Sequence, residues 1–508
     1  MTGAKDLIDH VLDAASFVGW NELPLDVGPS EAYRADLESA RARSGVDESV
    51  VTGEGRVRGR RVAIVVCEFA FLAGSIGVAA AERVVSAIER ATGEGLPILA
   101  SPTSGGTRMQ EGTVAFLQMV KIAAAVAAHK AAHLPYLVYL RNPTMGGVFA
   151  SWGSLGHITI AEPGALIGFL GPRVYEALYG EPFPDGVQTA ENLYRNGVID
   201  GVVPIKVLRP LIRRALVVAC GEASPKSVEP IPGDDVDVPA WESVLASRRP
   251  DRPGIRQLLR HATERVPLSG TGQGEAERTV LLSLARFGGM PCVLFGHDRL
   301  GQSPDRTMGP GALREARRAM RLAEELAIPL VTVIDTLGAS LSKEAEERGL
   351  APEIARCIAD LVMLDTPTIA VLLGQGSGGG ALALLPADRV IAARHGWLAP
   401  LPPEGASAIV YRDVSHAPEL AAAQGIRSRD LLRSGVVDRI VPEFEDAATE
   451  PVDFAKRMVE SISAELYALR HVAPESRRAT RLARYRNVGL SGRGGGSPES
   501  RSPGPRRS

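Results

Sequence analysis

LPYLVYLRNPTMGG, residues 134–147, is an apolar segment typical of a buried strand, and it runs directly into a pair of glycines. TPTIAVLLGQGSGGG, residues 366–380, repeats this plan, and Pro135 and Pro367 are 232 residues apart. Gly147 and Gly380 are 233 apart, and the prolines of LPIL (96–99) and IPLV (328–331) are again 232 apart. We therefore predict two similar domains in tandem, which can face each other across a shared cleft.

Strand and helix patterns alternate through both halves, which indicates βαβ units and the α/β class. A strand at 61–67 opens the first domain, a helix over 84–91 follows it, and a second helix runs from Met109 to about Ala132. The resulting division is listed here: a helical amino-terminal extension over 1–50, a first domain over 51–220, a linker over 221–254, a second domain over 255–470, and a disordered basic tail rich in Gly, Ser and Pro over 471–508.

Composition excludes several classes of protein. The 508 residues include 57 Lys and Arg against 59 Asp and Glu, a net charge of -2 that does not favour a nucleic-acid partner. The four cysteines lie far apart, which indicates neither a zinc ribbon nor a disulfide framework and fits a reducing cytoplasm. The first 20 residues resemble an amphipathic helix rather than a signal peptide, and no apolar run predicts a membrane span.

The glycine turns carry the strongest chemical signal. Backbone N–H groups can approach a ligand oxygen closely where no Cβ intervenes, and the start of a following helix adds partial positive charge. An oxyanion site and tight backbone packing both fit this pattern. A phosphate loop fits less well, because no lysine follows the glycines and no Gly-x-x-x-x-Gly-Lys-Ser/Thr motif occurs.

A further glycine cluster, SGGTRMQEG at 104–112, also ends a strand, and DTLGA at 335–339 is its counterpart. Arg108 either holds a substrate anion or pairs with Glu111 on the helix surface. His157 and Glu162 are either acid/base groups or structurally paired residues.

At these residues the chain resembles acyl-CoA carboxylase carboxyltransferases, with the bacterial acetyl-CoA carboxylase β and α subunits fused in that order. The resemblance covers roughly residues 35–445. The motifs that carry it are CEFAFLAGSIG (67–77), GGTRMQE (105–111), PTMGG (143–147), AEPGALIGFLGPR (161–173), IDTLGA (334–339), AEERG (345–349), GQGSGGGALA (374–383) and PEGA (403–406).

The resemblance implies two crotonase-like domains that move a carboxyl group from carboxybiotin to the α-carbon of an acyl-CoA. It implies that Gly146 and Gly147 donate backbone N–H groups to the thioester oxygen, and that Gly379 and Gly380 donate to the ureido oxygen of biotin. No side-chain base is needed, because the biotin anion removes the α-proton. Further expected contacts with cofactor or substrate are Gly105, Gly106, Arg108, Gly338, Ala339, Gly378, Gly405 and Ala406.

Partners also follow from the resemblance. No Met-Lys biotin acceptor is present, so we expect biotin to arrive on a carrier protein charged by a biotin carboxylase. A dimer or larger homo-oligomer is expected, because in this family the cleft joins the amino-terminal domain of one protomer to the carboxy-terminal domain of another. The β-subunit zinc ribbon has no counterpart in residues 1–66, so no metal is expected.

One departure from the family pattern affects the predicted biotin side. Leu337 replaces the proline of the usual Asp-Thr-Pro-Gly-Ala, so the backbone there has more freedom. Acetyl-CoA is the first expected substrate. A related decarboxylase and a non-catalytic acyl-CoA-binding paralogue are the alternatives, and the tail at 491–508 is either disordered or a docking segment for the carrier.

Overall fold

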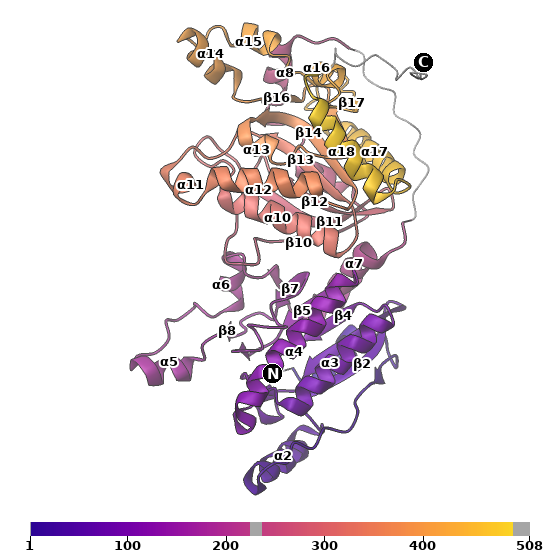
Figure 1. Cartoon of the computed structure of the whole chain (residues 1–508), viewed down its shortest axis with the longest axis vertical. Coiled ribbons are helices and arrows are strands. Elements are labelled where there is room, and N and C mark those ends of the chain that lie inside the picture. The colour runs from indigo at the N-terminus through magenta and orange to yellow at the C-terminus, as the bar shows by residue number, and fades with distance from the viewer. Residues whose placement is uncertain (1, 224–235, 491–508) are drawn as a thin grey trace, which may run out of the picture.

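Each half of the chain builds a mostly parallel sheet of the same topology, and Figure 1 shows the two sheets in separate domains stacked along the long axis. The computed structural model describes residues 2–223 and 236–490. The first sheet has the order β1-β2-β3-β4-β5-β7-β9, and the second has the order β10-β11-β12-β13-β14-β15-β17 with β16 beside β14. The predicted α/β fold with two tandem crotonase-like domains is confirmed.

The strands of the first domain are short and mostly buried. They are β1 (Val18–Gly19), β2 (Val50–Val57), β3 (Arg60–Cys67), β4 (Ile98–Ser101), β5 (Tyr136–Leu140), β6 (Thr144–Met145), β7 (Ile158–Ala161), β8 (Ile167–Gly168) and β9 (Gly201–Val202). The strands of the second domain are β10 (Glu264–Leu268), β11 (Val280–Phe287), β12 (Met290–His297), β13 (Leu330–Thr336), β14 (Thr368–Ser377), β15 (Arg389–Ala393), β16 (Trp397–Ala399) and β17 (Arg439–Val441).

Helices cover the faces of both sheets (Figure 1). In the first half they are α1 (Ala4–Val11), α2 (Glu31–Ser44), α3 (Val78–Gly93), α4 (Gly112–Ala131), α5 (Pro172–Tyr179), α6 (Ala190–Arg195) and α7 (Ile205–Cys220), with 3-10 turns at Leu72–Gly74 and Met109–Glu111. The remaining helices are α8 (Ala240–Ser247), α9 (Ile255–Arg260), α10 (Pro310–Glu325), α11 (Lys343–Glu347), α12 (Leu350–Met363), α13 (Gly378–Leu382), α14 (Pro403–Tyr411), α15 (Ala417–Ala423), α16 (Ser428–Arg433), α17 (Pro451–Leu469) and α18 (Pro474–Asn487).

An antiparallel hairpin joins β2 to β3 in the first sheet and β11 to β12 in the second, and in the first domain β2 precedes the strand predicted at 61–67. Arg58 and Gly59 have φ values of 52° and 84°, and this tight turn joins β2 to β3. Gly288 and Gly289, with φ values of 54° and 84°, join β11 to β12 in the same way. Positive φ at both central residues suits the twist of a two-residue hairpin, so each turn returns the chain antiparallel to the strand before it.

The predicted linker and tail are both more ordered than expected. Helix α8 lies inside the predicted linker, where the Ser247 hydroxyl accepts a 2.8 Å hydrogen bond from Nε1 of the buried Trp397. Helix α18 lies inside the predicted disordered tail, and its Arg481 is only 1% exposed and donates to the Thr368 hydroxyl at 2.8 Å. Residues 224–235 and 491–508 of these two predictions lie outside the described residues.

The two domains are joined by a continuous apolar core and by a buried ion pair. Side chains of α7, including Leu208 and Ile212, belong to the same buried cluster as Leu282 of the second sheet. Beside this cluster, Arg318 of α10 donates to both carboxylate oxygens of Asp200 at 2.8 and 3.0 Å. Apolar burial across the boundary stabilises one relative placement of the two domains within a chain.

Glu315 makes this junction sensitive to pH. Burial raises the pKa of its carboxyl to about 8, against the opposing effect of Arg318, while Glu277 and Asp200 raise it further. The folded chain therefore keeps a proton that the unfolded chain loses near pH 4.5, so this stabilisation is complete below pH 4.5 and is lost as the pH rises through 8.

We expect Glu315→Gln to unfold at a higher temperature than the native chain at pH 8.5, because the amide carries no charge to bury. At pH 5, where Glu315 is protonated in the folded state, the two chains should unfold at nearly the same temperature. Differential scanning calorimetry at both pH values measures the effect. A gap between the two chains that does not change with pH would contradict it.

Helix α4 is the one element of the described residues with the length and composition of a membrane span. The segment Met109–Ala131 has a mean hydropathy of 1.4, and 33% of its most apolar window is buried. One side of α4 packs on α3, whereas Val114, Phe116, Leu117 and Val120 are each more than half exposed. Core helices of soluble proteins share this length and composition.

Candidate active site

The turn at residues 144–148, here called the first-domain turn, is held by backbone hydrogen bonds to two neighbouring segments. The Met145 N–H donates to the Ser104 carbonyl at 2.9 Å, and the Gly146 N–H donates to the Gly168 carbonyl at 3.0 Å. Gly146 has a φ of 63°, which favours glycine. Its N–H is already used, so the prediction that Gly146 donates to a thioester oxygen is corrected: Gly146 shapes the turn.

Two other backbone N–H groups near this turn are free. Among the described residues, neither the Gly147 nor the Thr107 N–H has a hydrogen-bond partner. A Cβ atom placed on Gly147 would lie 3.4 Å from the Thr107 hydroxyl and 3.2 Å from Cγ of Met119, so the two segments are in contact. An oxyanion hole requires unpaired N–H groups on neighbouring segments, and Gly147 and Thr107 supply them. Thr107 was missed because its sequence context shows only a glycine cluster.

The turn at residues 376–380, the second-domain turn, has the same construction. Gly378 has a φ of 63°, equal to that of Gly146, and Gly338 (131°) matches Gly106 (122°). The structural match therefore pairs Gly147 with Gly379, one residue away from the pairing with Gly380 that the sequence repeat indicates. The sequence pairing is off by one residue because the second turn contains three consecutive glycines, and only backbone conformation distinguishes them.

Ala339 supplies the second donor in this domain. A Cβ atom on Gly380 would lie 3.4 Å from the Ala339 nitrogen, and the Ala339 N–H has no partner among the described residues. Gly379 and Gly380 lie in the first turn of α13, where N–H groups lack intrahelical acceptors. The predicted contacts Gly338, Ala339, Gly378, Gly379 and Gly380 are thus brought together in one place.

The loops beside both turns are braced in the same manner. The Gly106 N–H donates to the Ser104 hydroxyl at 3.0 Å, and the Gly338 N–H donates to the Thr336 hydroxyl at 3.1 Å. Gly105 is exposed and donates its N–H to the Ala73 carbonyl at 2.8 Å. Because their N–H groups are used, Gly105, Gly106 and Gly338 set the loop conformation and leave donation to the residues that follow.

Arg108 does not lie on the helix surface, and it is not free to hold a substrate. It is 1% exposed, and the Glu48 carboxylate accepts from Nη1 at 2.9 Å and from Nη2 at 2.5 Å. The remaining N–H groups of Arg108 face Tyr33, Ser49 and Ser75, and Glu111 is 3.7 Å away. The guanidinium is therefore not free for a substrate anion, because a carboxylate from the amino-terminal extension already binds it. The predicted pairing with Glu111 is present, but it is buried rather than on the helix surface.

The other predicted residues do not offer free N–H donors to the two turns. Gly405 and Ala406 are in the first turn of α14, and the Ala406 N–H is taken by the Pro402 carbonyl at 3.1 Å. Glu162 accepts from the Asn142 N–H at 3.1 Å, a structural contact. His157 immediately precedes β7, at the opposite end of the sheet from the first-domain turn, so it is not an acid/base group there.

Leu337 does not loosen its loop. Its N–H donates to the Gln302 side-chain oxygen at 3.3 Å, a hydrogen bond that a proline could not make. The same oxygen accepts from the Thr336 hydroxyl at 2.9 Å. The loop departs from the family pattern in sequence but is held by a compensating side chain.

A family model described as the carboxyl transferase domain matches residues 6–480. The chain belongs to the carboxyl transferase family. The family expected from the sequence motifs is therefore confirmed. The two glycine turns are the candidate active-site features of this carboxyl transferase chain.

Relatives and solved structures agree with this placement. The probable biotin-dependent acyl-coenzyme A carboxylase beta3 subunit of Mycobacterium tuberculosis is 67% identical over 487 residues, which span 96% of this chain and 98% of that protein. The acetyl-coenzyme A carboxylase carboxyl transferase subunits beta/alpha of Salinispora tropica are 39% identical, over 96% of this chain and 90% of that protein. A crystal structure of transcarboxylase 12S with methylmalonyl-coenzyme A bound has a TM-score of 0.73 at 21% identity, covering 92% of this chain and 89% of that one, and it supports the fold alone.

Metal ligands are not grouped in the part of the chain that the structure describes, where no cluster of three or more His, Cys, Asp or Glu could hold an ion. Cys67, Cys292 and Cys357 are buried, and Cys220 is partly buried. Burial raises the pKa of the Cys67 and Cys220 thiols to about 11, so neither is a ready nucleophile near neutral pH.

Proposed function

We propose that this chain is the carboxyltransferase subunit of a biotin-dependent acyl-CoA carboxylase that transfers a carboxyl group from carboxybiotin to the α-carbon of a short acyl-CoA, with acetyl-CoA as the first substrate. The observation that carries the proposal is the pair of free N–H donors in each domain, Thr107 with Gly147 and Ala339 with Gly379. Two sites for developing negative charge suit a reaction in which an enolate and a biotin anion both form.

The donors divide the work between the two reactants. Thr107 and Gly147 stabilise charge on the thioester oxygen while the α-carbon loses its proton. Ala339, Gly379 and Gly380 stabilise charge on the ureido oxygen of the biotin that a separate carrier protein delivers. All are backbone groups fixed by hydrogen bonds around them, so they need no rearrangement as charge develops. A partner biotin carboxylase, a carrier protein and a cytoplasmic location belong to the same proposal.

A transfer assay tests the proposal against its alternatives. Purified chain is mixed with carboxylated biotin carrier and either acetyl-CoA or propionyl-CoA, and products are separated by mass spectrometry. Malonyl-CoA or methylmalonyl-CoA is the expected product, and the ratio of the two rates gives the preferred acyl group. Consumption of added malonyl-CoA without any forward transfer would identify a decarboxylase, and CoA binding without turnover would identify a non-catalytic paralogue.

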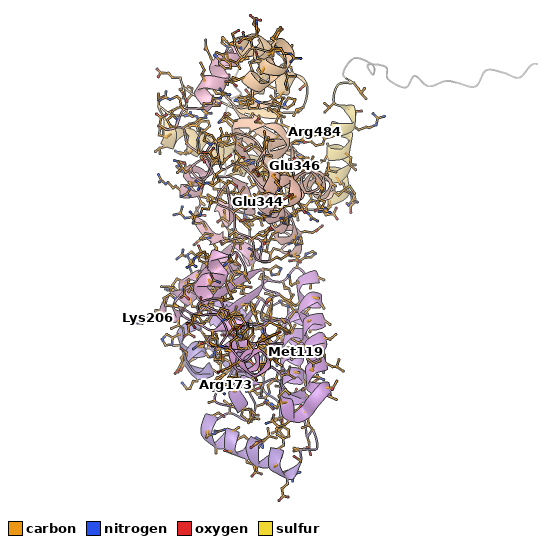
Figure 2. The ribbon with its side chains drawn as sticks, turned by 90° about the vertical axis from the view of Figure 1, so that its left-hand side faces the viewer. Met119, Arg173, Lys206, Glu344, Glu346 and Arg484 are labelled. Carbon is orange, nitrogen blue, oxygen red and sulfur yellow. The ribbon has the colours of Figure 1, made fainter. Side chains whose placement is uncertain are left out.

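The two turns of one chain lie in different domains. Figure 1 shows α4 and β8 in the lower domain and α13 in the upper one. Figure 2 likewise shows Met119, which contacts Gly147, in the lower domain, and Glu344 and Glu346 of α11 in the upper one. A complete site then needs a second copy of the chain, which brings its carboxy-terminal domain to the first-domain turn.

The exposed side of α4 is the proposed contact for that second copy. Leu117 is 55% exposed and Val120 is 69% exposed, beside the helix face that carries Met119. We expect Leu117→Asp combined with Val120→Asp to give a monomer with little transfer activity, because two charges cannot be buried unpaired at an interface. Light scattering after size-exclusion chromatography measures the mass.

Val452→Asp on α17 is the matched control, since Val452 is 66% exposed in the first turn of a helix, where an acidic residue is tolerated. This control should keep the native mass and rate. A doubly substituted α4 chain that keeps both the native mass and the native rate would show that α4 is not at the interface.

A further inference from the structure

A cavity of about 270 Å³ lies at the junction of the two domains within one chain. The first domain contributes the carboxy-terminal end of α4 and the start of β7, and the second contributes the end of α10 and the loop at 271–273. The polar residues around it are Lys130, Ser154, His157, Thr159, Asp200, Thr271, Gln273, Arg318, Arg321 and Glu325. The cavity is at the opposite end of β5 and β7 from the first-domain turn, so it is separate from the proposed active site.

His157 directs an unused hydrogen-bond donor into this cavity. Its side chain is 1% exposed, and its Nδ1 accepts from the Tyr136 N–H at 3.0 Å. In the neutral ring the proton therefore belongs to Nε2, which has no hydrogen-bond partner among the described residues. Burial, with Lys130, His129 and Arg318 nearby, holds the pKa of His157 well below its usual range, so the ring stays neutral near pH 7. A buried donor without an acceptor is unfavourable unless a ligand or water supplies the acceptor.

Two cationic side chains surround the same space. Lys130 donates to the Leu155 carbonyl at 3.2 Å and lies 3.1 Å from a carboxylate oxygen of Glu325. Arg321 lines the cavity and forms no hydrogen bond or ion pair with the described residues. Arg318 is not available, because both of its Nη nitrogens are used by Asp200 and by the carbonyls of Ser269 and Gly270.

Glu325 is the second carboxylate that the described residues place here, and its charge partner is Lys130 rather than Arg318. Its Oε2 lies 3.4 Å from Nε2 of His157, in a direction that makes no hydrogen bond. It is also 36% exposed, so it is able to turn outward to water. Lys130, Arg321 and His157 thus supply more hydrogen-bond donors than the one Glu325 carboxylate can accept from. The charges of Arg318 and Asp200 cancel each other, and the remaining charged side chains give the cavity a net positive charge.

We propose that this interdomain cavity binds a small oxyanion of the phosphate type, which accepts hydrogen bonds from His157 Nε2, Lys130 and Arg321 and displaces Glu325. The ligand contacts both domains of the chain, so its binding stabilises their junction. Free phosphate and the terminal phosphate of a nucleotide share this chemistry.

Isothermal titration of the purified full-length chain with inorganic phosphate tests the site, with coenzyme A present so that the proposed acyl-CoA site does not contribute. We expect one saturable site per chain, and at least about tenfold weaker binding by Arg321→Ala, the loss expected for one charge-assisted hydrogen bond. Arg278→Ala removes the same charge from an exposed position outside the cavity and should bind as the native chain does.

Glu325→Gln provides a test of opposite sign. Removing the competing carboxylate should tighten phosphate binding. A misfolded variant would bind phosphate more weakly, so tighter binding cannot come from misfolding. Thermal unfolding in phosphate-free buffer checks that each variant is folded. A parallel titration with ADP assigns the source: tighter binding of ADP than of phosphate identifies a nucleotide, and the reverse identifies the free ion. No saturable binding to the native chain, or equal binding by the native chain and Arg321→Ala, would overturn the proposal.

Discussion

Gly147→Val is expected to transfer carboxyl groups about 10² to 10³-fold more slowly than the native chain, the usual effect of losing one oxyanion donor. A Cβ atom at this position already lies 3.2 Å from Met119 and 3.4 Å from the Thr107 hydroxyl, and the two methyl groups of valine add further contacts. The branched side chain therefore crowds Met119 and Thr107, and we expect it to move the Gly147 N–H away from the place where the thioester oxygen is proposed to lie. Steady-state rates with carboxylated carrier and acetyl-CoA measure the loss.

Gly93→Val is the control, since Gly93 is exposed at the end of α3 and a Cβ there meets nothing within 4 Å. Both variants should unfold at temperatures close to that of the native chain, which separates a catalytic effect from a folding defect. Native turnover by Gly147→Val would remove Gly147 from the proposed site.

Mixing two inactive chains tests whether each cleft is shared. Gly379→Val is expected to be slow as well, because its Cβ would lie 2.7 Å from Ile354 and would displace the second-domain turn. A mixed dimer of Gly147→Val and Gly379→Val contains one cleft with neither substitution. Random reassembly of equal amounts should therefore recover about a quarter of the native activity. Recovery no greater than that of either variant alone would contradict the shared cleft.

The duplication was readable from sequence because it rests on patterns that repeat: apolar strands, glycine turns and the prolines before them. β5 lies inside the apolar segment predicted as a buried strand, since Tyr136–Leu140 is apolar throughout and flanked by breakers. The hairpin turn at Arg58-Gly59 was missed because its positive φ values are a property of the backbone. Helix α18 was missed because its composition is that of a tail, and only tertiary contacts of residues such as Arg481 make it part of the fold.

The site was predictable only as a set of glycines. Which N–H groups are free depends on long-range hydrogen bonds, such as the one that ties Gly146 to Gly168. The sequence repeat paired Gly147 with Gly380 instead of Gly379 for a similar reason. Three consecutive glycines look alike in sequence, so only their backbone conformation shows which one matches Gly147. The main partner of Arg108 was missed for a related reason: Glu48 is 60 residues earlier in the chain, and local spacing indicated only the longer pair with Glu111.

Arg108→Met is expected to destabilise the first domain by about 3–5 kcal/mol, because it leaves the Glu48 carboxylate buried without its partner. Glu48 is 2% exposed, and Arg108 supplies two of its hydrogen bonds. Burial opposes the charge on Arg108, but Glu48 more than offsets this and raises the pKa of the guanidinium. At roughly 2–4 °C for each kcal/mol, the unfolding temperature of this domain should fall by about 6–20 °C.

The double variant Arg108→Met with Glu48→Met distinguishes a broken ion pair from lost packing. Removing both charges takes away the unpaired carboxylate, so the double variant should be more stable than Arg108→Met alone. Scanning calorimetry of the native chain, both single variants and the double variant gives the coupling between the two residues. If Arg108 instead held substrate, its single variant would unfold at the native temperature and show only a raised KM for acyl-CoA, which would contradict the structural role.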